Sequence, residues 1–116
     1  MKTDQLGSLR NALRVFAKDR EWDQFHSPKN LAIAVSVEAA ELLEHFQWRN
    51  TNEEALDSAT RHRVAEEMAD VLLYLIRLAD KLDVDLLGAA AQKMKANARK
   101  YPVEKSRGSS KKYTEL

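Results

Sequence analysis

Apolar residues recur at intervals of three and four along most of the chain, and this periodicity restricts the possible folds more than any other feature. It places Leu6, Leu9, Leu13 and Phe16 on one helical face, and it continues through the longest apolar segment, residues 64–82. No run alternates apolar with polar residues, and the 116 residues include only 3 Gly and 2 Pro. Strands are therefore disfavoured. The sequence predicts an all-α fold of four helices.

Residues typical of helix starts divide the chain further. Ser27 is a good N-cap and Pro28 suits the first helical position, so a second helix is predicted from Pro28 to about Gln47. Thr51 followed three residues later by Glu54 forms a capping box. This box predicts the start of the third helix.

The last part of the chain is expected to hold one more helix and a tail. Asp83 or Asp85 would cap the fourth helix, and Pro102 would end it. The segment EKSRGSSKKYTEL beyond it is polar and has too few apolar residues to hold itself in a core. We therefore expect one helical domain over residues 1–102, followed by a polar basic tail over residues 103–116 that is either loose or a strap on the body.

Composition excludes several classes of protein. The 19 Lys and Arg nearly balance the 18 Asp and Glu, leaving a net charge of +1, so no global field draws the chain to nucleic acid or a membrane. The chain has no Cys, which excludes disulfide frameworks, thiol nucleophiles and cysteine zinc sites. The charged N-terminal segment does not resemble a secretory signal, and no segment is apolar enough to span a bilayer. We expect a cytoplasmic protein with no membrane and no nucleic acid polymer as partner.

The apolar residues also bear on assembly. A chain of 116 residues forms one domain with a modest core. In residues 71–82, however, apolar side chains occupy more than one stripe, which a lone chain of this size would not bury completely. This pattern favours a homo-oligomer.

Four acids interrupt the apolar faces of the second and third helices. Glu38 lies on the stripe that includes Leu31, and Glu41 lies beside it one turn on. Glu67 and Asp70 share a face of the third helix in the same way. If these helices form an antiparallel hairpin, the two acid pairs face each other across the groove.

Carboxylates that converge in a partly desolvated groove must be protonated, spread into water or neutralised by a cation. Oxygen ligands without Cys favour Mg²⁺, or Mn²⁺, over Zn²⁺. Magnesium held by carboxylates usually completes its shell with water and substrate phosphates, so a phosphate substrate follows. The alternative is that the acids belong to ordinary solvated faces.

The C-terminal part of the chain is basic and would complement such a site. From Lys93 to Lys112 there are eight Lys or Arg against one acid, Glu104. Lys93, Asn97 and Lys100 share one helical face and can reach a polyphosphate together. The same pattern also fits a solvated basic helix end, which the helix dipole favours.

Aromatic residues gather at the two ends of the second helix. Trp22, Phe25 and His26 lie in the connector before it, and Phe46 and Trp48 end it. Such rings can stack on a nucleotide base. Alternatively, the two Phe residues belong to the core and Trp48 covers the end of the bundle.

Together these residues resemble a known family. Glu38-Ala-Ala-Glu41, 25 intervening residues and Glu67-Met-Ala-Asp70 are similar to the E-x-x-E and E-x-x-D signature of the all-α MazG-like nucleotide pyrophosphohydrolases. The segments QFHSPKN, FQW and KYPVEKSRGSSKKYTEL resemble the dCTP pyrophosphatase branch of that family. The resemblance extends from about Phe16 to Leu116.

The resemblance implies a Mg²⁺-dependent hydrolysis of a nucleoside triphosphate to the monophosphate and pyrophosphate, which removes unwanted nucleotides from the pool. It also implies a dimer or tetramer whose chains complete the helical bundle. The implied metal ligands are Glu38, Glu41, Glu67 and Asp70, and the proton acceptor would be one of these or Glu66. The implied substrate contacts are Lys93, Asn97, Lys100 and Tyr101 for the phosphates, His26, Trp22 and Trp48 for the base, and Tyr74 for the sugar.

Two non-enzymatic functions compete with this interpretation. A helical interaction module would use the acidic groove to bind a basic partner, and it would tolerate removal of metal. A nucleic-acid binder would use the basic end, although the near-zero net charge argues against it.

Overall fold

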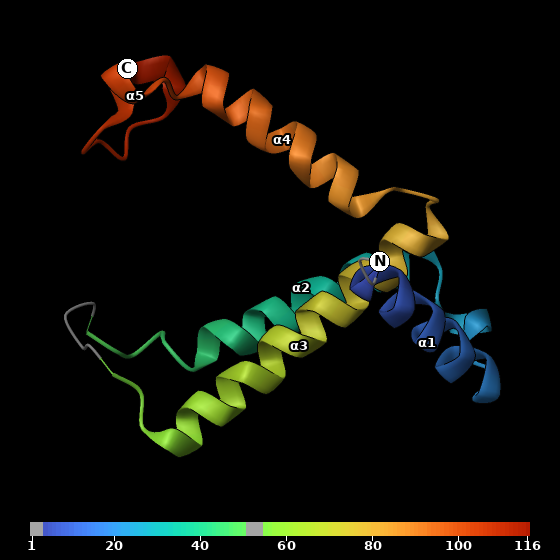
Figure 1. The fold of residues 1–116 in the computed structure, drawn as a ribbon. Coiled ribbons are helices and arrows are strands. Elements are labelled where there is room, and N and C mark those ends of the chain that lie inside the picture. Colours follow the sequence, from blue (N-terminus) through green and yellow to red (C-terminus); the bar gives the residue numbers. More distant parts are fainter. Residues whose placement is uncertain (1–3, 51–54) are drawn as a thin grey trace. The chain divides into compact units, whose positions relative to one another are not determined.

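The computed structural model describes residues 4–50 and 55–116, and the regular elements within them are all helical (Figure 1). These residues form two compact units, one up to Asp83 and one from Val84 onward. The four main helices confirm the predicted all-α fold. None of the helices in the described ranges is both long enough and apolar enough to cross a membrane. The predicted domain boundary after residue 102 stays a prediction.

An antiparallel helix pair is the centre of the first unit. α2 (Pro28–Glu44) and α3 (Ser58–Lys81) lie side by side, and α1 (Gln5–Asp19) packs on α3 (Figure 1). A short 3₁₀ helix, η1 (Asp23–Phe25), lies between α1 and α2. The buried apolar residues of the described chain are Ala17, Leu31, Val64, Ile76 and Ala79. This small core holds together the facing sides of α2 and α3, which also carry the acids.

The start of α2 follows the sequence prediction. Ser27 has the extended backbone of an N-cap, and its hydroxyl oxygen accepts the backbone N–H of Asn30 at 3.1 Å. Pro28 occupies the first helical position, where its missing N–H costs nothing. The helix ends at Glu44, slightly before the predicted Gln47, and continues into a turn.

The predicted start of the third helix is wrong. Thr51 and Glu54, the expected capping box, lie outside the described residues, and α3 begins only at Ser58. Asp57 is the N-cap, because its carboxylate accepts the backbone N–H of Thr60 at 2.7 Å and the hydroxyl of the same residue at 3.1 Å. The extended backbone that this cap requires separates α3 from the chain before it.

The second unit consists of α4 (Leu86–Lys100), α5 (Val103–Ser106) and a final 3₁₀ turn, η2 (Tyr113–Glu115). Of the two predicted caps, Asp85 is the one used, since its carboxylate accepts the N–H of Gly88 at 3.1 Å. Asp83 instead has a left-handed backbone, with φ of 54°, directly after α3. This conformation ends α3.

The C-terminal residues are more regular than a loose tail. Besides forming α5 and η2, they return to the end of α4, where the ring of Tyr113 meets that of Tyr101 edge-on at 6.1 Å between centroids (Figure 1). The ammonium of Lys100 lies 5.0 Å from the centre of the Tyr113 ring, within the range of a cation–π contact. Aromatic contacts therefore order a segment whose few apolar residues predicted little structure.

Candidate metal centre and adjoining cavity

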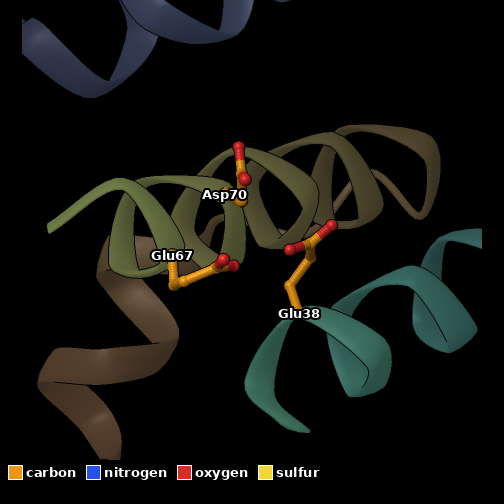
Figure 2. Close-up of side chains that lie close together, drawn as sticks. All are labelled: Glu38, Glu67 and Asp70. Atoms are coloured by element: carbon orange, nitrogen blue, oxygen red, sulfur yellow. The ribbon is translucent and has the colours of Figure 1, made fainter. Parts of the chain in front are cut away.

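Carboxylates from two helices converge between α2 and α3. Glu38 comes from α2, and Glu67 and Asp70 come from α3. Each offers an oxygen within 4.8 Å of the others. Figure 2 shows the Glu38 and Glu67 side chains reaching toward one another, with Asp70 on the next turn of α3. We call these three residues the acid cluster. The antiparallel pairing of the helices brings the two sequence motifs together as predicted.

Two oxygens of the acid cluster have nothing to satisfy them within the described chain. Oε2 of Glu38 and Oε2 of Glu67 are buried and have no hydrogen-bond partner. A buried carboxylate in this state costs free energy unless it gains a proton or a cation. The donor set consists of hard oxygens, which fits Mg²⁺ or Mn²⁺. The residues present therefore fit a divalent metal ion.

The electrostatics of the acid cluster agree with this fit. The pKa of Glu38 is raised from 4.5 to about 7, chiefly by burial and then by the neighbouring Glu41 through a hydrogen bond and its charge. Burial also raises the pKa of Glu67, again with a contribution from Glu41. Glu41 therefore lies beside the acid cluster and acts on it electrostatically. Each additional negative charge makes binding of a cation more favourable.

Glu66 lies in a different environment from its neighbour Glu67. Its carboxylate pairs with Nε2 of His62 at 2.8 Å, one turn earlier on α3, and both side chains are largely exposed. The structure therefore keeps this candidate proton acceptor outside the acid cluster.

A cavity of about 210 Å³ adjoins the acid cluster, because Asp70 belongs to both. Three residues predicted to contact the base or sugar, Trp22, His26 and Tyr74, line it. The Trp22 ring meets Phe16 edge-on at 5.6 Å and His26 at 6.2 Å between ring centroids. The remaining lining residues are Leu13, Phe16, Ala17, Leu73 and Arg77. The cavity is thus mainly apolar and aromatic, with one acid, Asp70, in its lining.

The other predicted substrate contacts belong to other parts of the chain. Trp48 lies in the turn after α2, is 89% exposed and does not line the cavity. Lys93, Asn97 and Lys100 lie on α4 in the second unit, and Tyr101 is its C-cap. Their expected roles with phosphate, and that of Trp48 with the base, stay predictions.

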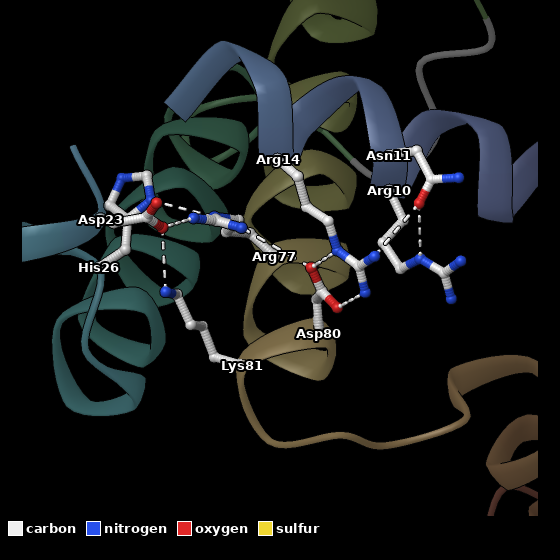
Figure 3. A network of polar contacts seen from close by, with 8 residues as sticks. All are labelled: Arg10, Asn11, Arg14, Asp23, His26, Arg77, Asp80 and Lys81. Carbon is white, nitrogen blue, oxygen red and sulfur yellow. Dashed lines mark hydrogen bonds and ion pairs between the residues drawn. The ribbon is translucent and has the colours of Figure 1, made fainter. Parts of the chain in front are cut away.

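Sequence reasoning missed the polar groups behind the cavity. Arg77 is 5% exposed, and its guanidinium donates to Asp23 and, from Nε at 3.2 Å, to Nδ1 of His26 (Figure 3). Asp80 accepts two hydrogen bonds from Arg14, at 2.5 and 2.7 Å. Among the residues drawn in Figure 3, we call the following the Arg77 network: Arg14, Asp23, His26, Arg77, Asp80 and Lys81. The signal in the sequence that pointed to this network was Arg77 itself, a charged residue within an apolar stretch of helix.

The pattern described as the MazG-like family matches residues 33–116, which is most of the chain. The chain belongs to the MazG-like family. MazG-like hydrolases use a divalent metal ion, and the acid cluster supplies the kind of ligands that such an ion needs.

Relatives of this MazG-like chain have names that state an activity. Over 114 residues, 96% of this chain, it is 44% identical to dCTP pyrophosphatase 1 of Mus musculus, of which it covers 67%. The corresponding protein of Homo sapiens is 45% identical over the same share of this chain, with 67% of that protein covered. The fold also matches the crystal structure of a pyrophosphatase from Archaeoglobus fulgidus, with a TM-score of 0.77 and 40% identity over 88% of this chain and 96% of the other.

Proposed function

We propose that this MazG-like chain is a metal-dependent dCTP pyrophosphatase that hydrolyses dCTP, or a related pyrimidine nucleoside triphosphate, to the monophosphate and pyrophosphate. The observation that carries the proposal is the acid cluster with its two unsatisfied oxygens beside an aromatic cavity. The proposal is further supported by the relatives named dCTP pyrophosphatase 1, which are about 44% identical over nearly the whole chain. The reaction would remove unwanted nucleotides from the pool.

The proposed metal is Mg²⁺, with Mn²⁺ as a substitute, held by Glu38, Glu41, Glu67 and Asp70. When bound, the ion supplies positive charge that polarises the triphosphate and balances the carboxylates. The acids orient the attacking water, and one of them takes its proton. Glu66, already paired with His62 at the surface, is the less favourable acceptor.

The proposed base pocket is the cavity lined by Trp22, His26 and Tyr74. Its aromatic walls can stack on a pyrimidine, whereas a purine needs more volume. For the phosphates we retain the contacts predicted from the sequence, which are Lys93, Asn97, Lys100 and Tyr101. A contact between Trp48 and the base is tested by Trp48→Ala. If the contact exists, this variant should show a smaller ratio of kcat/KM for dCTP to that for dATP.

We also propose that the chain works as a homo-oligomer, either a dimer or a tetramer. Large apolar side chains on the two central helices stay exposed in the single chain, with Ile33 at 51%, Val37 at 49% and Met68 at 57%. A second chain that covers them would complete the bundle and bury this surface. The cytoplasmic location stays a prediction.

The proposal is tested by a panel of deoxyribonucleoside and ribonucleoside triphosphates with Mg²⁺, in which pyrophosphate and orthophosphate are measured separately. We expect dCMP and pyrophosphate from dCTP, and no turnover in EDTA. Release of orthophosphate with dCDP would overturn the assigned reaction. Undiminished turnover of dCTP in EDTA would overturn the role of the metal. No turnover of any nucleotide would favour the interaction module.

A further inference from the structure

Arg77 is a buried cation in the wall of the cavity. Its Nε donates to Nδ1 of His26 at 3.2 Å, and one of its amino nitrogens donates to Asp23. Its other amino nitrogen lies 3.6 Å from the carboxylate of Asp80. The guanidinium charge is thus balanced by two acids, while its Nε is committed to one particular atom of a histidine that lines the cavity.

This contact determines where the proton of His26 resides. The guanidinium of arginine is always protonated, and its nitrogens only donate. Nδ1 of His26 must therefore carry a lone pair, which leaves the ring neutral with its hydrogen on Nε2. Burial, followed by the charge of Arg77, lowers the pKa of His26 against the opposing effect of Asp23, so the neutral ring is favoured.

Nε2 of His26 is left for a ligand. In Figure 3 the ring nitrogen that does not meet Arg77 points away from it. Within residues 4–50 and 55–116 this nitrogen has no hydrogen-bond partner. The ring itself lines the cavity with Trp22 and Tyr74. The lining of the cavity therefore combines aromatic side chains with N–H donors, those of Trp22 and Arg77 as well as that of His26.

We propose that Arg77 is a positioning residue that fixes His26 in the Nε2–H form, so that the cavity presents a donor to an acceptor atom on the edge of a pyrimidine base. In cytosine both O2 and N3 are acceptors, and O2 is shared by all pyrimidines. This inference rests on the proposed function, because it takes the cavity as the pocket for the base of dCTP. It adds a source of specificity that lies outside the acid cluster.

Loss of Arg77 has a pH-dependent consequence. The charged and titratable groups around His26 are Arg77, Lys81, Asp70 and Tyr74 from α3 and Asp23 from η1, while α1 presents only apolar side chains. Without Arg77, Asp23 is free to accept a hydrogen from Nδ1, and Nε2 then becomes an acceptor. Protonation of the ring at lower pH places hydrogens on both nitrogens and restores the donor.

The test compares Arg77→Met with wild type between about pH 6 and pH 8.5. At the upper end we expect Arg77→Met to raise KM for dCTP about fivefold to tenfold, the effect of one lost hydrogen bond, with a smaller change in kcat. The ratio of variant to wild-type KM should fall toward one near pH 6. Because both proteins are compared at each pH, titration of the acid cluster cancels. Arg14→Met, which breaks another contact of the Arg77 network, is the control and should keep the ratio near one at every pH.

Other outcomes would overturn the inference. A rise in KM that is equal at every pH would mean that Arg77 itself contacts the substrate, and an unchanged KM would leave Arg77 a purely structural residue. Nitrogen-15 NMR of the wild-type protein gives a second measurement that does not require the variant to fold, with the His26 signal assigned by its loss in His26→Gln. We expect the neutral ring to carry its hydrogen on Nε2, and the Nδ1–H form would refute the inference. If wild type fails to cleave dCTP, the proposed function fails while the NMR result still decides the tautomer.

Discussion

The acid cluster and the Arg77 network both include residues of α3, but they differ in how their charges are satisfied. In the Arg77 network the buried guanidinium has acceptors on three sides, and Asp80 has two donors. In the acid cluster, the buried Oε2 atoms of Glu38 and Glu67 have no hydrogen-bond partner among the residues that the structure describes. A network that satisfies its own charges stabilises the fold and positions side chains. A cluster that leaves them unsatisfied stores a cost that a bound cation can relieve.

The largest expected effect separates activity from folding at the acid cluster. Glu67→Gln keeps the shape of the side chain but removes one ligand charge, so kcat/KM for dCTP should fall about a hundredfold or more. In EDTA the melting temperature should not fall, because a repelling charge has gone. Glu44→Gln, an exposed acid on α2, should leave both unchanged. If Glu67→Gln instead lowers the melting temperature in EDTA, the loss of activity would reflect a structural role of Glu67.

The Arg77 network should show the opposite behaviour. Asp80→Asn removes the charge that faces Arg77 and accepts from Arg14, which should lower the free energy of unfolding by about 1–3 kcal/mol. The loss should be the same with Mg²⁺ and with EDTA, as measured by urea unfolding. Asp19→Asn, an exposed acid at the end of α1, is the control. A loss that depends on Mg²⁺ would contradict the separation of the two regions.

The two regions should also respond to pH in opposite directions. The pKa of Glu38 is raised from 4.5 to about 7, so its contribution to stability is complete below pH 4.5 and is lost as the pH rises through 7. The pKa values of Asp23 and Asp80 are lowered from 3.8, so their contribution is present above that pH and is lost as the pH falls further. Unfolding in EDTA should therefore show stability falling between about pH 4.5 and pH 7. Added Mg²⁺ should remove that fall, and a flat profile in EDTA would contradict the account.

The smallest effect lies outside both regions and provides a baseline. Glu21, just after α1, has a left-handed backbone with φ of 56°. Glu21→Gly relieves this strain and should stabilise the protein by about 0.5–1 kcal/mol. Since no part of either charged region changes, the gain should be independent of Mg²⁺ and of pH. Thermal unfolding under the conditions used for the other variants measures this gain. A gain that varies with Mg²⁺ would show that backbone strain at Glu21 is coupled to metal binding.

The acid cluster was predictable from sequence because helical periodicity is a local property. The spacing of Glu38 from Leu31, and of Glu67 from Asp70, fixes the face on which each acid lies, and an antiparallel pair then brings the faces together. The Arg77 network was not predictable in the same way. Its contacts join Arg77 to residues more than fifty positions earlier, and no spacing rule reaches that far.

Other differences arise where several residues compete for one role. Thr51 and Asp57 are both residue types that favour an N-cap, so propensity does not choose between them, and Asp57 is the one that caps α3. Trp48 follows the end of α2, where helical periodicity no longer assigns a direction to its side chain. The sequence therefore indicated which aromatic residues lie near the site, but it did not indicate which of them line the cavity.

We expect the acid cluster to bind a divalent cation, and thermal unfolding with and without Mg²⁺ is the direct test. An ion that binds only the folded chain adds about 2.7 kcal/mol at a hundredfold excess over Kd, which corresponds to a rise of about 10 °C in Tm for a domain of this size. We expect this rise for wild type, its loss in Glu67→Gln and its retention in Asp80→Asn. Equal melting temperatures of wild type in millimolar Mg²⁺ and in EDTA would contradict it.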